Sequence, residues 1–105
     1  MRNKGRRSPA PPRPPLPEAG GSPLVQRARR LRRRGEVRKA LVALREACLV
    51  DEYDAATWTL YGALLVHEGR VNDGRQALRH AVWLRRRVGD EARVRSTEAL
   101  LARAA

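Results

Sequence analysis

Residues 58 to 81 read WTLYGALLVHEGRVNDGRQALRHA, and the same order of side-chain sizes stands 34 residues earlier, where residues 24 to 47 read LVQRARRLRRRGEVRKALVALREA. Large apolar residues, small residues and a glycine recur at equivalent places in the two stretches. The matched pairs are Leu24 with Trp58, Ala28 with Gly62, Leu31 with Leu65, Gly35 with Gly69, Val37 with Val71, Ala40 with Gly74, Leu44 with Leu78, and Ala47 with Ala81. A pattern that recurs at such an interval is typical of stacked supersecondary units.

Each unit is predicted to be a pair of α-helices. Apolar residues recur three or four positions apart, and no segment alternates with the period of two that a strand requires. Ser22 and Pro23 favour a helix start, Gly35 and Gly69 favour helix ends, and Asp54 is a plausible N-cap. The expected helices cover 23–34, 36–50, 55–67, 72–87 and 91–103. The sequence therefore predicts an all-α fold of about five helices arranged as antiparallel hairpins.

The repeat resembles the tetratricopeptide repeat, and the second unit shows the resemblance best. Trp58, Gly62, Leu65, Gly69, Gly74, Leu78 and Ala81 stand at positions where that family places residues of these sizes. Tyr61 replaces a usual leucine and Gly74 a usual alanine, and the customary closing proline is absent from both units. The resemblance covers residues 22 to about 88.

The resemblance implies a short α-solenoid spanning residues 22–105. Repeat one would cover 22–54, repeat two 55–88, and a capping helix 90–104. The small residues would let paired helices approach closely while the large ones fill the spaces between them. Because such hairpins cannot bury their apolar faces alone, homodimerisation or docking on another protein is an expected source of stability.

Residues 1–21 are predicted to form a disordered basic arm, since they contain six of the seven prolines and show no apolar periodicity. Pro11 to Pro17 favours the extended polyproline helix, which can dock in an aromatic groove or serve as a stiff basic linker.

The formal charge of +12 is concentrated at one end of the chain. Residues 1–38 carry 12 basic and 2 acidic groups (+10), whereas residues 39–105 carry 11 basic and 9 acidic groups (+2). This asymmetry indicates contact with a polyanion, which can be a nucleic acid, an anionic membrane surface or an acidic protein. Arginine outnumbers lysine 21 to 2, so a compositional bias that leaves a solvated charged surface is the alternative.

In the family that the chain resembles, the first helix of each hairpin lines a binding groove. The corresponding residues are Val25, Arg29, Arg32 and Arg33 on the first wall, and Thr59, Ala63, Val66 and His67 on the second. Arginines at one end suit an extended peptide with acidic and aliphatic residues, because a guanidinium binds a carboxylate through two parallel hydrogen bonds. The lysine and asparagine of the family's carboxylate clamp are missing, so the sequence does not favour binding to chaperone tails.

Catalytic and cofactor-binding patterns are lacking in the sequence. His67 and His80 fall on different predicted helices without a convergent carboxylate or cysteine pattern, and neither a glycine-rich phosphate loop nor a nucleophile elbow is present. Cys48 is the only cysteine and stands on an apolar helix face, so an inert packed thiol is expected. We therefore expect no enzyme activity, cofactor or metal.

No apolar run is long enough for a membrane span or a secretory signal, and the single cysteine fits a reducing cytosol. Two functional hypotheses follow. The first is a cytoplasmic protein-interaction adaptor that binds a partner through the groove, and the second is a small nucleic-acid-associated protein that uses the arginine-rich N-terminal region.

Overall fold

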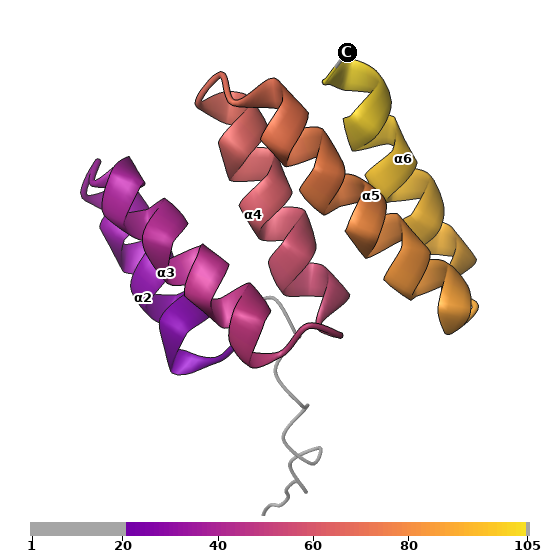
Figure 1. Ribbon diagram of the computed structural model, residues 1–105, viewed down its shortest axis with the longest axis horizontal. Coiled ribbons are helices and arrows are strands. Elements are labelled where there is room, and N and C mark those ends of the chain that lie inside the picture. Colours follow the sequence, from indigo (N-terminus) through magenta and orange to yellow (C-terminus); the bar gives the residue numbers. More distant parts are fainter. Residues whose placement is uncertain (1–20, 105) are drawn as a thin grey trace, which may run out of the picture.

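The computed structural model describes residues 21–104 as five α-helices, and this range contains no strand. The helices are α2 (Pro23–Arg33), α3 (Val37–Val50), α4 (Ala55–His67), α5 (Val71–Arg87) and α6 (Glu91–Arg103). They lie side by side in chain order as two antiparallel hairpins followed by a last helix (Figure 1). The predicted all-α fold is confirmed, whereas residues 1–20 of the predicted arm lie outside the described range.

Two of the helices begin at side-chain caps that the sequence indicates. The Ser22 hydroxyl accepts a hydrogen bond from the Val25 amide at 3.2 Å, ahead of the proline at the first helical position. The Asp54 carboxylate accepts hydrogen bonds from the amides of Ala56 at 3.1 Å and Thr57 at 3.4 Å. These bonds satisfy amides that have no partner within the helix.

Three glycines with positive φ end α2, α4 and α5. Gly35, Gly69 and Gly89 have φ values of +83°, +85° and +73°. At each of them the glycine amide donates to the carbonyl three residues earlier, and the next amide donates to the carbonyl five residues before it, at 2.9 to 3.1 Å. This is the Schellman arrangement, which favours glycine because a left-handed backbone disfavours residues with a Cβ. The same turn therefore joins the two helices of each hairpin, and it also joins α5 to α6.

The repeated positions are mostly buried in both hairpins. Of the sixteen paired residues, Leu24, Trp58, Val37 and Val71 are partly buried, and the turn residues Gly35 and Gly69 are exposed. The other ten are buried: Ala28, Leu31, Ala40, Leu44, Ala47, Gly62, Leu65, Gly74, Leu78 and Ala81. The backbones of α4 and α5 approach closely, since a Cβ on Gly62 would come within 2.9 Å of the carbonyl oxygen of Gly74. The small residues are thus placed where the backbones meet.

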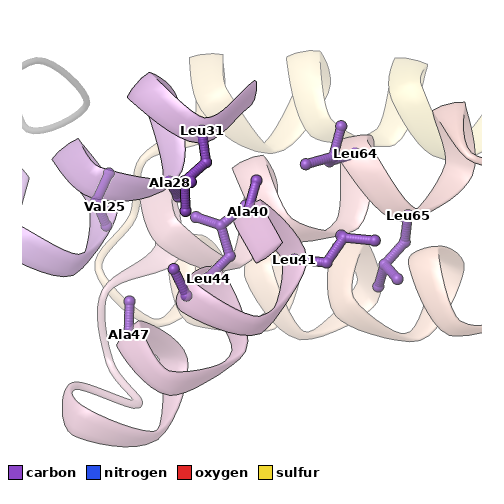
Figure 2. Close-up of a cluster of buried hydrophobic side chains, with 10 residues drawn as sticks. Val25, Ala28, Leu31, Ala40, Leu41, Leu44, Ala47, Leu64 and Leu65 are labelled. Carbon is purple, nitrogen blue, oxygen red and sulfur yellow. The ribbon is translucent and has the colours of Figure 1, made fainter. Parts of the chain in front are cut away.

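The two hairpins meet along α3 and α4. Leu41 and Leu44 of α3 and Leu64 and Leu65 of α4 belong to one buried apolar cluster, in which the side chain of Leu41 points toward α4 (Figure 2). Because this cluster joins the hairpins, the stack has a continuous core.

The last helix packs on α5 through a different face from the one that the repeat spacing marks. Ala92, Ser96 and Ala99, which stand 34 residues after Trp58, Gly62 and Leu65, are all exposed. Val94 and Thr97 are buried instead. Hence α6 contacts the second hairpin with the side that α4 turns toward the first hairpin, as shown by the correspondence of Val94 with Leu60.

Candidate binding surface

The predicted groove residues on α2 are divided between the core and the surface. Val25 is only 3% exposed and belongs to the buried cluster, so it contributes nothing to the groove surface. Arg32 and Arg33 are exposed, and Arg29 is partly buried. Of the four residues predicted for the first wall, the three arginines therefore remain at least partly accessible, and the apolar valine does not.

Arg29 is the most constrained of these arginines. Its Nε atom is buried and has no hydrogen-bond partner among residues 21–104. A buried donor without an acceptor costs free energy. The Nη atoms of Arg29, which are not buried in this way, are the donors left for a ligand with acceptor oxygens.

The residues predicted on α4 take several different positions. Thr59 and Ala63 are partly buried. Val66 lies against α5, where a Cβ on Gly74 would come 2.5 Å from its Cγ2 atom, so its side chain is engaged between the helices. His67 is exposed, with Nδ1 3.1 Å from Glu68 Oε2. The second wall thus consists mainly of Thr59 and Ala63, and carries no cation apart from the histidine when it is protonated.

A buried arginine that the sequence did not single out lies beside this wall. Arg85 on α5 is 9% exposed, and its Nη2 atom donates a hydrogen bond to the Thr59 hydroxyl at 3.3 Å. The same hydroxyl donates to the Ala55 carbonyl at 2.8 Å. Arg85 stands in a run of three arginines in the sequence, and residue type alone does not distinguish it from its exposed neighbours Arg86 and Arg87.

A ladder of aromatic rings lies along α4 and α5. The His80 ring meets the edge of Trp58 at 4.5 Å between centroids and stacks on Trp83 at 5.7 Å, and the Arg87 guanidinium lies 4.7 Å from the centre of the Trp83 ring. Trp83 is 49% exposed. These contacts hold the indole in place on the outer surface of α5.

The possible metal ligands are dispersed over the described part of the chain. Within residues 21–104 no three His, Cys, Asp or Glu side chains are placed to hold a metal ion. Cys48 is buried, and burial, followed by the negative charge of Asp54, raises the pKa of its thiol to about 12. The thiol is thus protonated at neutral pH, as expected for a packed cysteine.

The fold and its surfaces define a small all-helical protein built from stacked hairpins. In the comparisons with known proteins, no family model, no curated protein and no solved structure matched the chain. Within residues 21–104 no helix has both the length and the apolar character required to cross a membrane.

Proposed function

We propose that the protein is a non-catalytic interaction module that binds an acidic peptide of a partner protein between α2 and α4. The observation that carries this proposal is the contrast between the two walls. Arg29, Arg32 and Arg33 present positive charge from α2, and none of them takes part in an ion pair among the described residues. Arginines in this state favour ligands that bring carboxylates.

The wall on α4 adds a neutral surface beside this charge. Thr59 and Ala63 are small, and both are partly exposed. An extended peptide needs room for its backbone and small pockets for alternate side chains. The resemblance of the repeat to the tetratricopeptide family supports the same assignment, and the single cysteine supports a reducing, cytoplasmic setting.

A peptide-display selection with the full chain as bait tests the proposal. We expect the enriched peptides to carry Asp or Glu next to aliphatic residues. Binding should fall at least tenfold for a variant with Arg29→Glu, Arg33→Glu and Ala63→Trp. Peptides that bind this variant as tightly as the natural chain would show that the groove is not the binding surface.

The control for this selection is the variant Arg27→Glu, Arg30→Glu. It changes the same number of charges on the same helix, but at residues outside the predicted groove. Peptides held in the groove should retain their affinity for this variant to within about threefold, because the long-range loss of charge is screened at physiological ionic strength.

A second candidate function is sequence-independent binding to nucleic acid, and it rests on the charge of α2. This helix places six arginines at positions 27, 29, 30, 32, 33 and 34, counting its C-cap, and contains no acidic residue. Titrating a 20-nucleotide single-stranded RNA with the full chain at increasing salt tests this function, since phosphate contacts give an affinity that falls steeply with salt. A weak affinity with no salt dependence would exclude it.

A further inference from the structure

The side of the first hairpin that faces away from α4 carries an apolar hollow with a basic rim, which we call the open side. The hollow has a volume of about 310 Å³, with a second of about 210 Å³ beside it, and no residue of α4 lines either of them. Their floor is apolar and their rim carries arginines. The floor consists of Leu24, Leu31, Val42 and Ala43, and the rim includes Arg27, Arg30 and Arg34.

On the second hairpin the α4 part of the corresponding side is covered by the first hairpin, whereas Gln76, the counterpart of Val42, is exposed. Thirty-four residues after Arg27 and Arg30 stand Tyr61 and Leu64, and Leu64 is buried in the cluster against which Tyr61 packs. The turn before α4 reaches the same side, since Trp58 Nε1 donates to a carbonyl of that turn at 3.0 Å. In the second hairpin, a preceding helical element therefore covers this side. In the first hairpin, no residue of the described range 21–104 covers the same side.

The charge of the open side has one predominant sign. Arg27, Arg30 and Arg34 lie at spacings of three and four along α2, so their like charges repel one another and disfavour the helix. None of them forms an ion pair with a residue in the described range. Glu46 is the one acidic residue that lines the hollow. A side that only had to be soluble would be served by charges of both signs, whereas this arrangement is complementary to an anionic partner.

The chain itself does not supply a matching occupant. Residues 1–20 contain five basic residues, one acidic residue and six prolines, so they have the wrong charge and disfavour a helix. The exposed side of α6 on a second copy carries both signs, for example Glu91 and Arg95. Nucleic acid suits the arginines, but no aromatic side chain lines the two hollows to stack on a base.

We propose that the open side binds an amphipathic, acidic α-helix of a partner protein. The apolar face of that helix would enter the hollow over Leu24, Leu31 and Val42, while its Asp and Glu residues would face Arg27, Arg30 and Arg34. The helix takes the place that the first hairpin occupies on the second. This surface is distinct from the groove between α2 and α4, and the module therefore has two binding surfaces with separate ligands.

A designed peptide tests this inference directly. The probe is an 18-residue fluorescein-labelled helix with leucines on one face and glutamates on the other, titrated with the full chain and followed by fluorescence anisotropy. We expect saturable binding, and at least a tenfold loss of affinity for the triple variant Arg27→Glu, Arg30→Glu, Arg34→Glu. Val42→Glu should weaken binding at least fivefold, because residue 42 lies on the floor and is 62% exposed, which lets the substitution leave the fold intact.

Two control variants separate the open side from general charge effects. The triple variant Arg29→Glu, Arg32→Glu, Arg33→Glu makes the same change of charge on α2 and should bind the helix within threefold of the natural chain. Leu49→Glu matches Val42→Glu, since it is an apolar residue of α3 that is 64% exposed and lines neither hollow. Circular dichroism tests whether each variant is folded. If the Arg27, Arg30 and Arg34 variant unfolds, the double variant Val42→Glu, Arg27→Glu replaces it.

Several results would overturn the inference. Equal losses for the two triple variants would mean that the helix is attracted only by net charge. A single-stranded RNA that displaces the peptide and is itself released by the Arg27, Arg30 and Arg34 changes would assign the surface to nucleic acid. Self-association of the natural chain that the open-side variants abolish, without peptide binding, would assign it to a second copy. If the natural chain binds the helix probe but enriches no acidic peptide that depends on the groove residues, that result would count against the proposed function alone.

Discussion

Gly62 and Gly74 meet where α4 crosses α5, at the positions that Ala28 and Ala40 occupy in the first hairpin. A Cβ on Gly62 would lie 2.8 Å from Leu78 Cγ, and one on Gly74 would lie 2.7 Å from the Gly62 carbonyl oxygen. Neither distance is compatible with an added carbon unless the helices move apart. The second hairpin thus depends on residues without side chains, although glycine in a helix costs about 1 kcal/mol relative to alanine.

We expect Gly62→Leu to lower the free energy of unfolding by ~1 to 3 kcal/mol, the range for overpacking a close contact. Urea denaturation followed by circular dichroism at 222 nm measures this change. The matched control is Ser96→Leu, at the equivalent but exposed position of α6, which should change the free energy of unfolding by less than about 0.5 kcal/mol. Equal effects of the two substitutions would contradict the assigned packing of α4 on α5.

Cys48 should be unreactive while the protein is folded. Burial raises the pKa of its thiol from 9.0 to about 12, so the reactive thiolate is scarce at pH 8. The stabilisation that comes from keeping the thiol neutral is complete below the unfolded pKa near 9 and is lost as the pH rises toward 12. Ellman's reagent at pH 8 should label the unfolded protein within minutes and the native protein far more slowly, and equally fast labelling would show that the thiol is accessible.

At the scale of helices and turns, the sequence predicts the architecture well because its signals are local. Gly35 and Gly69 indicate helix ends, and both residues adopt the left-handed backbone that this requires. The second and fourth helices begin at Val37 and Val71, one residue later and one residue earlier than expected. Shifts of this size are normal, because the terminal turn of a helix has few hydrogen bonds to fix its start.

The burial of the predicted groove residues was less predictable, because it depends on contacts between hairpins. Leu24, Ala28 and Leu31 mark the face of α2 that meets its own partner helix, whereas Val25 is buried in the apolar cluster that the first hairpin shares with α4 of the next one. Periodicity within one helix does not reveal this second neighbour. Arg85 was missed for the same reason, since its burial comes from the packing around Thr59 and leaves no trace in residue type.

The α4 cap provides a prediction at the scale of one helix. The Asp54 carboxylate accepts hydrogen bonds from two amides and from the Thr57 hydroxyl, the last at 2.8 Å. Asp54→Ala should lower the free energy of unfolding by about 0.5 to 2 kcal/mol, the usual effect of losing an N-cap. Asp54→Ser keeps an acceptor at this position and should recover most of the loss in thermal denaturation. Equal melting temperatures for the alanine variant and the natural chain would show that the cap is not needed.

Across the whole molecule, stability should be distributed unevenly between the two hairpins. The α4–α5 pair is held by a close backbone approach and is covered on one side by α3 and on the other by α6. In contrast, α2 buries only Val25, Ala28 and Leu31 and carries repelling arginines. The first hairpin is therefore expected to open more readily than the second.

Hydrogen exchange measures this difference. At low salt the amides of α2 should exchange at least tenfold faster than those of α4 and α5. Raising the ionic strength should slow exchange in α2 selectively, because salt screens the repulsion between its arginines. The amides of α5 are the internal control, because their exchange rates should change little with salt. Uniform protection across all five helices, unaffected by salt, would contradict the uneven distribution of stability.

The identical turns at Gly35, Gly69 and Gly89 also bear on how the molecule can be lengthened. Each turn connects its helix to the next one with the same hydrogen-bond pattern and a positive-φ glycine. The first two turns stand one repeat apart. A duplicate of residues 36–69 spliced in after Gly69 would thus start and finish in phase with its surroundings. The architecture is in this respect modular, so the number of hairpins can be altered by insertion while the existing junctions keep their form.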